Sequence, residues 1–265
     1  EHPGLTTLSN IMKTIALSTA HSFADQGAVY DKDTRENIIT MALVDKTADV
    51  LRKHSIEVLE VPDDIGLRQT IKWINDRTKL NSIDLAIELH CNECSDPRAH
   101  VVYCWYYHNS SYTKRHAQAI VDGIHAETGL YKRGVKDEYT NRWGRLGFVH
   151  DTTPLAALIE CGFITNPQDR KLLMSESGRY DIGKGIARGC LTYLGEKWRP
   201  ELLEPSRPPE KDNTVKRLEN EIALLKRTVD GLQRKNEQIL SEAERECQDK
   251  LKNFRDKVIN LVKNA

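Results

Sequence analysis

The sequence has little that would draw it to nucleic acid or into a membrane. Lysine plus arginine and aspartate plus glutamate are equal at 39 each, so no net field favours a polyanionic partner. No run of about 18 apolar residues is present, as a membrane-spanning helix requires, and the N-terminus lacks the charged and then apolar order of a signal peptide. We therefore expect no nucleic-acid partner, no membrane partner and synthesis in a cytoplasm without a signal peptide.

The sequence also lacks the cysteine pattern of a disulfide scaffold or a four-thiolate zinc site. Its six cysteines are scattered, and Cys91-x-x-Cys94 has no second pair beside it. A chain of 265 residues can bury a core without disulfides, so we expect reduced thiols. A redox role would need a helix beginning at the pair, so we interpret Cys91 and Cys94 as incidental small residues.

Aromatic residues are scarce, at 6% of the chain, yet several cluster near polar segments. They end a predicted strand over 100–108 or lie in the stretch 131–145, which we predict to be rich in loops. Such rings could stack on a sugar or line a peptide groove, and packing beneath loops explains any one of them equally well. The residues concerned are Trp105, Tyr106, Tyr107, Tyr139 and Trp143.

Apolar runs and helical periodicities alternate along the first two thirds of the chain. We predict strands over 13–18, 57–61, 83–90, 100–108 and 155–159. We predict helices over 33–54, 67–80, 112–128 and 180–198, with Thr34 as the cap of the first. This alternation predicts one α/β domain over residues 12–199, a three-layer sandwich in which a mostly parallel or mixed twisted sheet lies between helices.

Several predicted strands end in side chains that can bind a metal or move a proton. The last strand runs into Glu160, and Gly162 beyond it permits backbone conformations that other residues avoid. The third strand ends at His90, His21 follows the first strand, and Glu36 lies in the first turn of the first helix. Open α/β sheets place their chemistry at the carboxyl ends of strands, so these four residues organise the predicted site.

Two imidazoles and one carboxylate around an open fourth position form a catalytic zinc site, and His21, Glu36 and His90 fit that set. Glu160 would then serve as a base that takes a proton and returns it to the leaving group. Each residue also has a structural explanation. A histidine at a strand end is often a hydrogen-bonded surface residue, and a glutamate in a first helical turn favourably faces the helix dipole. The residues alone leave both interpretations open.

Four motifs resemble those of one known family, in the family's order. Ala20-His-Ser-Phe-Ala-Asp-Gln-Gly-Ala28 resembles the first metal motif of the zinc-dependent N-acetylmuramoyl-L-alanine amidases of bacterial autolysins and phage endolysins. Glu36 sits where the second ligand of that family lies, and Leu89-His-Cys-Asn92 resembles its third-ligand motif. Leu158-Ile-Glu-Cys-Gly-Phe-Ile-Thr-Asn166 is similar to the segment that holds the catalytic glutamate. The similarity covers about residues 12–195.

The resemblance implies a function. It implies that His21, Glu36 and His90 bind Zn²⁺ and that Glu160 is the catalytic acid and base. The implied reaction is hydrolysis of the amide between the lactyl group of muramic acid and L-alanine, so peptidoglycan is the expected substrate.

Further polar residues in or near these motifs are candidates for contact with substrate. We expect Asn92, Arg133 and Asn166 to bind it. His108 and His150 also stand at predicted strand ends, where either could contact substrate or be a hydrogen-bonded surface histidine.

Glu88 departs from the family pattern, which commonly has a small polar residue at this place. Strand alternation puts Glu88 on the same side as His90. We therefore expect it to lie next to the metal ligands, where it could crowd or orient them.

The composition changes after the predicted domain. Residues 200–212 are rich in proline, which indicates a stiff, extended linker. Over 213–265 apolar residues recur at alternating spacings of three and four, which predicts a coiled coil, and Asn236 at a core position favours a parallel dimer through residues 215–261. A single helix folded back on the domain is the alternative. The core positions are Val215, Leu218, Ile222, Leu225, Val229, Leu232, Asn236 and Ile239.

Together these features favour a phage endolysin made in the host cytoplasm that acts on the wall after its release. Residues 1–11 precede Met12 and are interpreted as a leader or a remnant of expression. A secreted autolysin or cell-separation amidase is the alternative enzyme. A non-catalytic, wall-associated coiled-coil scaffold is the alternative of a different class.

Overall fold

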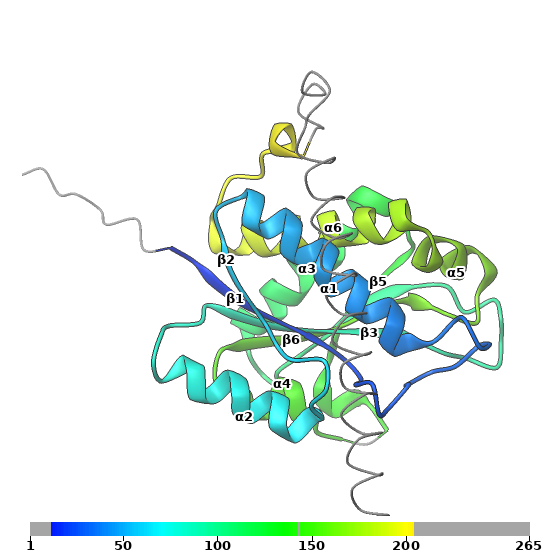
Figure 1. The fold of residues 1–265 in the computed structure, drawn as a ribbon, viewed down its shortest axis with the longest axis horizontal. Helices are drawn as coiled ribbons and strands as arrows, with labels where there is room; N and C mark the ends of the chain where they lie inside the picture. Colours follow the sequence, from blue (N-terminus) through cyan, green and yellow to red (C-terminus); the bar gives the residue numbers. More distant parts are fainter. Residues whose placement is uncertain (1–11, 143, 204–265) are drawn as a thin grey trace, which may run out of the picture. The chain divides into compact units, whose positions relative to one another are not determined.

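A mixed β-sheet forms the centre of the part of the chain that the computed structural model describes, residues 12–142 and 144–203. Its strand order is β2-β1-β3-β6-β4-β5 (Figure 1). The first four of these run parallel, whereas β4 is antiparallel to β6 and β5 is parallel to β4. The strands are β1 (Thr14–Thr19), β2 (Glu57–Glu60), β3 (Leu85–Asn92), β4 (Val102–Tyr106), β5 (Lys132–Asp137) and β6 (Leu155–Phe163).

Helices cover both faces of the sheet (Figure 1). One face carries α1 (Glu36–Lys53), α3 (Ser111–Thr128) and α6 (Glu176–Leu194), which pack on one another and on the larger hydrophobic core. The other face carries α2 (Leu67–Thr78) and the short α4 (Gly147–Asp151) over a smaller core. This arrangement confirms the predicted α/β architecture. The remaining elements are η1 (Glu138–Thr140), α5 (Pro167–Met174) and η2 (Pro200–Leu202).

Strand β3 shows how the sequence divides its side chains between the two faces. Leu85, Ile87 and Leu89 are fully buried in the larger core. The alternate residues Glu88 and His90 therefore point to the face of α2 and α4, because successive side chains in a strand point to opposite faces. That face has small residues at its centre, among them Ala16, Ala86 and Ala156, so a helix can pack closely while the polar ends of the strands stay open.

Several local predictions are wrong. Helix α1 begins after Arg35, and Thr34 does not cap it. The backbone N–H of Thr34 instead donates a hydrogen bond to Asp31 in the preceding turn. The stretch expected to be loop-rich contains β5, and α5, for which no helix was predicted, begins at Pro167 with Asn166 as its cap.

The five cysteines among the described residues are free thiols, as expected. None of the described helices is long and apolar enough to cross a membrane. The predicted leader 1–11, Trp143, most of the proline-rich linker and the predicted coiled coil lie outside the described residues.

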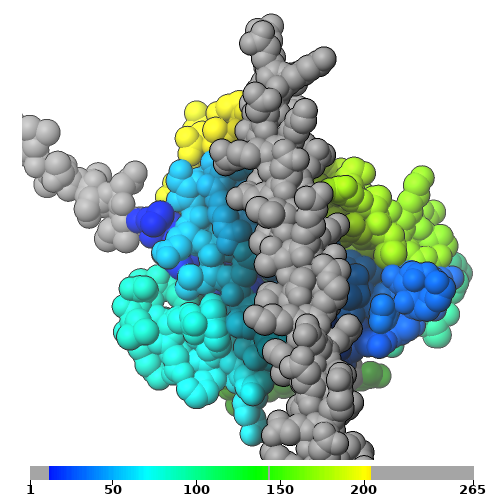
Figure 2. Space-filling view, viewed as in Figure 1, coloured from blue at the N-terminus to red at the C-terminus, as the bar shows by residue number. Residues whose placement is uncertain are grey.

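In the space-filling view the loop between β1 and α1, in blue, lies beside α5, in yellow-green (Figure 2). The guanidinium of Arg170 in α5 stacks 3.8 Å from the ring centroid of Tyr30 in that loop. This contact holds the loop that follows His21 against α5, the helix that follows the carboxyl end of β6.

Candidate metal centre and catalytic site

The fold brings together the three residues predicted to bind a metal. His21, Glu36 and His90 each offer a ligand atom, and these atoms lie within 4.8 Å of one another. His21 follows the carboxyl end of β1, His90 lies near the end of β3 and Glu36 begins α1. Two imidazoles and one carboxylate at this spacing fit a catalytic zinc site with one open position. This donor set is the only one of at least three His, Cys, Asp or Glu residues with such spacing in the described part of the chain.

Glu36 lies between the two histidines. Its Oε2 is 3.2 Å from His21 Nε2, and its Oε1 is 3.2 Å from His90 Nδ1. The backbone N–H groups of Ala28 and Cys91 also donate to the carboxylate, at 2.8 and 3.0 Å. Burial alone would raise the pKa of Glu36, but hydrogen bonds and charge from the imidazoles outweigh it and lower the pKa. Glu36 therefore remains ionised, as a metal ligand must.

The loop after β1 orients His21. Asp25 Oδ2 lies 2.8 Å from His21 Nδ1, which directs Nε2 toward Glu36. Gly27 adopts φ +64°, and a Cβ atom there would lie 2.4 Å from His21 Cδ2 and 2.5 Å from Glu36 Oε2. The glycine is thus required by a close approach of the backbone to two of the ligands.

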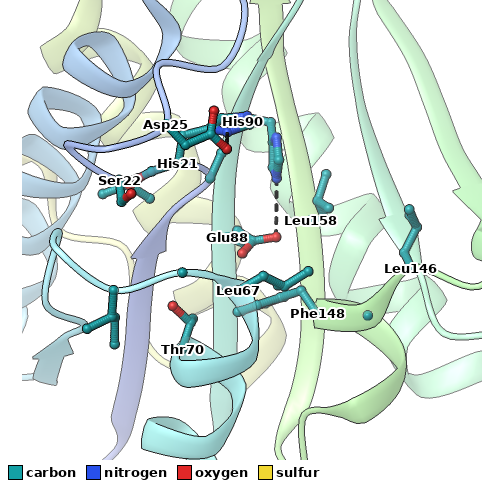
Figure 3. Close-up of a pocket in the computed structure, with 15 residues that line it drawn as sticks. His21, Ser22, Asp25, Leu67, Thr70, Glu88, His90, Leu146, Phe148 and Leu158 are labelled. Carbon is teal, nitrogen blue, oxygen red and sulfur yellow. Dashed lines mark hydrogen bonds and ion pairs between the residues drawn. The ribbon is translucent and has the colours of Figure 1, made fainter.

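Glu88 contacts the second nitrogen of His90. Its Oε2 lies 3.2 Å from His90 Nε2, and Figure 3 shows the two side chains aligned along β3. Burial raises the pKa of Glu88, although the hydrogen bond and charge of His90 oppose this. Glu88 therefore lies next to the ligand, as strand alternation predicts, and holds the imidazole from the side opposite Glu36.

Glu160 is the register partner of His90 on the neighbouring strand β6. Its Oε2 is buried and accepts no hydrogen bond from the protein. Burial raises the pKa of Glu160 to about 7, the negative charge of Glu36 adds to this effect, and the cationic side chains of His90, Lys136 and His21 oppose it. A carboxyl group with a free oxygen and a pKa near neutrality can both accept and donate a proton.

A pocket of about 290 Å³ opens beside this centre. His21 and His90 lie at one end, and Leu67 and Thr70 of α2 lie at the other (Figure 3). Leu146, Gly147 and Phe148 at the start of α4 complete its wall. The pocket thus lies on the face with the smaller core, between the two helices that cover it.

The residues predicted to bind substrate have different surroundings. Asn92 donates a hydrogen bond from its side-chain amide to the hydroxyl of Tyr103. Arg133 is exposed at the bulge where β5 begins. Asn166 is buried and caps α5, where its side-chain oxygen accepts from two backbone N–H groups and its amide donates to Pro97. Contact with substrate stays a prediction for all three, and the cap gives Asn166 a structural role.

His108 and His150 lie away from the metal centre. Because β4 runs antiparallel to β6, the carboxyl end of β4 lies beside the amino end of β6. It is therefore at the other end of the strands from Glu160. His108 Nδ1 is 2.9 Å from Asp137, and His150 Nδ1 is 2.9 Å from the buried Glu138. Neither histidine joins the ligand set.

Asp25 is the site residue that the sequence analysis missed. It lies four residues after His21 inside the first motif, where the sequence pattern assigns it no role. Only the turn of the loop brings its carboxylate back to the ring, and no periodic pattern in the sequence encodes that turn.

The fold and the site together define an α/β domain with a His₂Glu set that could hold a metal ion and a glutamate on the neighbouring strand. Residues 15–192 match the N-acetylmuramoyl-L-alanine amidase family. This match covers more than half of the chain, and the protein belongs to that family.

Curated relatives are cell-wall amidases. A probable cell wall amidase LytH of Staphylococcus saprophyticus is 23% identical over 186 residues, which are 69% of this chain and 59% of the relative. The germination-specific N-acetylmuramoyl-L-alanine amidase of Bacillus subtilis is 25% identical over 205 residues, 71% of this chain and 82% of the relative. The chain thus spans little more than half the length of the LytH relative.

Solved structures share the fold. The catalytic domain of CwlV from Bacillus (Paenibacillus) polymyxa var. colistinus superposes with a TM-score of 0.61 at 24% identity, over 70% of this chain and all of that domain. The catalytic domain of the CD27L endolysin targeting Clostridia Difficile gives a TM-score of 0.55 at 24% identity, over 71% of this chain and 99% of that domain.

Proposed function

We propose that this protein hydrolyses the amide between N-acetylmuramic acid and L-alanine in peptidoglycan, with Zn²⁺ held by His21, Glu36 and His90. The observation that carries the proposal is the position of Glu160. It lies on β6 as the register partner of His90, and its Oε2 accepts no hydrogen bond from the protein. Family membership supports the same reaction. When bound, the metal would supply Lewis-acid polarisation of the substrate carbonyl and an activated water.

The protein's own groups perform the proton transfers. Glu160 accepts the proton of the attacking water and delivers it to the leaving nitrogen of alanine, for which a pKa near 7 is suited. Asp25 and Glu88 hold the two imidazoles in their orientations from outside the ligand set. The leucines and Phe148 give the pocket an apolar wall, which would shield one side of the scissile bond from water.

Clearing of purified cell walls tests this function. The protein should lower the turbidity of a wall suspension, lose this activity on treatment with a chelator and regain it with Zn²⁺. Protein that contains stoichiometric zinc and leaves walls of every tested chemotype intact would support the scaffold alternative instead.

We further propose that the enzyme is a phage endolysin made in the host cytoplasm. Free thiols at the five described cysteines are compatible with a reducing compartment. The CD27L endolysin has the same catalytic fold, but so do bacterial wall amidases, so the likeness favours neither origin. A gene whose reading frame encodes an export signal upstream of Met12 would identify a secreted enzyme.

We also propose that residues 213–265 join two copies of the enzyme through a parallel coiled coil. The heptad pattern with Asn236 at a core position supports this proposal. Light scattering should give a dimer for the intact chain and a monomer for a chain that ends at Trp198. A monomeric intact chain would favour the helix that folds back.

A further inference from the structure

Lys136 holds its ammonium over two aromatic rings. Its Nζ lies 3.4 Å from the ring centroid of Tyr103 and 4.9 Å from that of Trp105. Lys136 on β5 is the register partner of Trp105 on β4. The rings of Tyr103 and Trp105 meet edge to face at 5.7 Å, so they form one platform. Attraction between the cation and the rings fixes the position of a side chain that is otherwise long and mobile.

This platform lies on the face of the sheet that carries the catalytic glutamate. Tyr103 is the register partner of Glu160, and Trp105 is the partner of Leu158, which lines the pocket. Asn92, two residues after His90, donates to the Tyr103 hydroxyl and holds the ring in place. Lys136 is two strands away from Glu160 and two residues along from its row, which corresponds to roughly 12 Å between the backbones at about 4.8 Å per strand and about 3.4 Å per residue.

The ammonium has no direct ion-pair partner in the described part of the chain. Among the described residues, no carboxylate lies within ion-pair distance of Lys136 or of the neighbouring Arg133, whereas several other lysines of this domain form such pairs. Lys136 is half-buried, and its pKa is lowered first by burial and then by the charge of Arg133, while the charge of Glu160 acts in the opposite direction. A half-buried cation beside a second cation provides a favourable position for an anion.

The proposed substrate offers an anion on one side of the scissile bond only. The lactyl carboxyl of muramic acid is consumed in the amide, so the glycan side is neutral. The peptide side continues beyond alanine and can carry carboxylates. An extended peptide advances about 3.3–3.6 Å per residue, so roughly 12 Å corresponds to between three and four residues.

We propose that Lys136, held on the Tyr103 and Trp105 platform and assisted by Arg133, binds a carboxylate of the substrate peptide within about four residues of the scissile amide. This inference rests on the proposed amidase function. It assigns Lys136 a role in specificity, since a peptide whose carboxylate is replaced by an amide presents no charge to the ammonium.

Two synthetic N-acetylmuramoyl peptides test the inference. One carries glutamate after alanine, and the other carries the matching neutral amide. A charge-assisted hydrogen bond should give the wild type about a tenfold preference for the acid. Lys136→Met should remove that preference through a higher KM for the acid, with kcat within about twofold, and Lys136→Arg should retain part of it. The matched control is Lys132→Met, which removes an exposed lysine of β5 that pairs with Asp122.

The outcomes are distinct. Equal losses by Lys136→Met on both peptides would mean that Lys136 acts on Glu160 through its charge, and an unchanged preference would mean that the carboxylate binds elsewhere; either result overturns the inference. Calorimetric binding of both peptides to Glu160→Gln, with and without Lys136→Met, gives the preference without hydrolysis. If the wild type hydrolyses neither peptide, the proposed function fails, and the binding preference alone decides this inference.

Discussion

His90 and Glu160 are register partners on the adjacent parallel strands β3 and β6. One side chain faces Glu36 in the ligand set, and the other keeps an oxygen free of any protein donor. The proposed ligand and the proposed proton-transfer group are thus separated by one strand spacing, about 4.8 Å at the backbone. The sheet itself fixes the position of the proposed base relative to the proposed metal centre.

Replacement of Glu160 should separate catalysis from metal binding. Glu160→Ala should retain a full equivalent of zinc and lose about 10²–10⁴-fold in hydrolysis rate, the usual contribution of a general acid and base. His90→Ala should lose both metal and activity, because it removes one of three ligands. Metal analysis and wall-clearing rates measure the two effects. His108→Ala is the matched control, since this histidine pairs with Asp137 at the opposite edge. Loss of metal in Glu160→Ala would show that Glu160 is a ligand.

Gly27→Ala should weaken metal binding without preventing folding. The added Cβ would collide with His21 and Glu36, so we expect zinc affinity to fall by at least about tenfold. Gly129→Ala is the control, because Gly129 also has a positive φ, +72°, and no atom lies near its Cβ position. Both variants should lose about 1–2 kcal/mol of stability from backbone strain. Zinc titration against a competing chelator measures the difference. Similar affinities for both variants would show that the loop accommodates the added methyl group without displacing His21 and Glu36.

His116 should make the stability of the domain depend on pH. It is fully buried in α3 against Tyr193, and neither of its ring nitrogens has a hydrogen-bond partner. Burial lowers its pKa to about 3 from 6.5. Below pH 6.5 the unfolded chain therefore binds a proton at His116 that the folded chain does not bind. The free energy of unfolding falls as the pH drops from 6.5 toward 3.

The test compares wild type with His116→Leu by urea unfolding at pH 7.5 and pH 5. The variant should lose less stability between these values, by about 1–2 kcal/mol, since each unit of pKa difference corresponds to about 1.4 kcal/mol. An identical pH response in both proteins would mean that His116 finds a partner in solution.

The sequence predicts best those parts of the fold that burial dictates. Strands β1, β3 and β6 are apolar because helices cover both of their faces. His21, His90 and Glu160 stand out in the sequence because they lie at or just after the ends of these apolar runs. Strand β5 is different. It is the last strand of the sheet, its segment Lys132–Asp137 is half-exposed, and without an apolar alternation it resembles a loop. For α5 a signal exists, because Asn166 followed by Pro167 is a typical cap and first helical residue.

Contacts between distant segments account for the rest of the site. The hydrogen bond from Cys91 to Glu36 and the stacking of Lys136 on Tyr103 join residues that no periodicity relates. Such contacts appear only once the strand order is known, since β6 lies between β3 and β4, and β5 pairs with β4 at the end of the sheet.

Analysis of the products tests the central claim most directly. Purified peptidoglycan treated with the zinc-loaded protein should yield new amino-terminal L-alanine, in amounts that rise with loss of turbidity, and no new reducing sugar ends. The same assay with Glu160→Ala should yield neither. New reducing ends in place of amino-terminal alanine would show cleavage of the glycan and would contradict the assignment of this site as an N-acetylmuramoyl-L-alanine amidase.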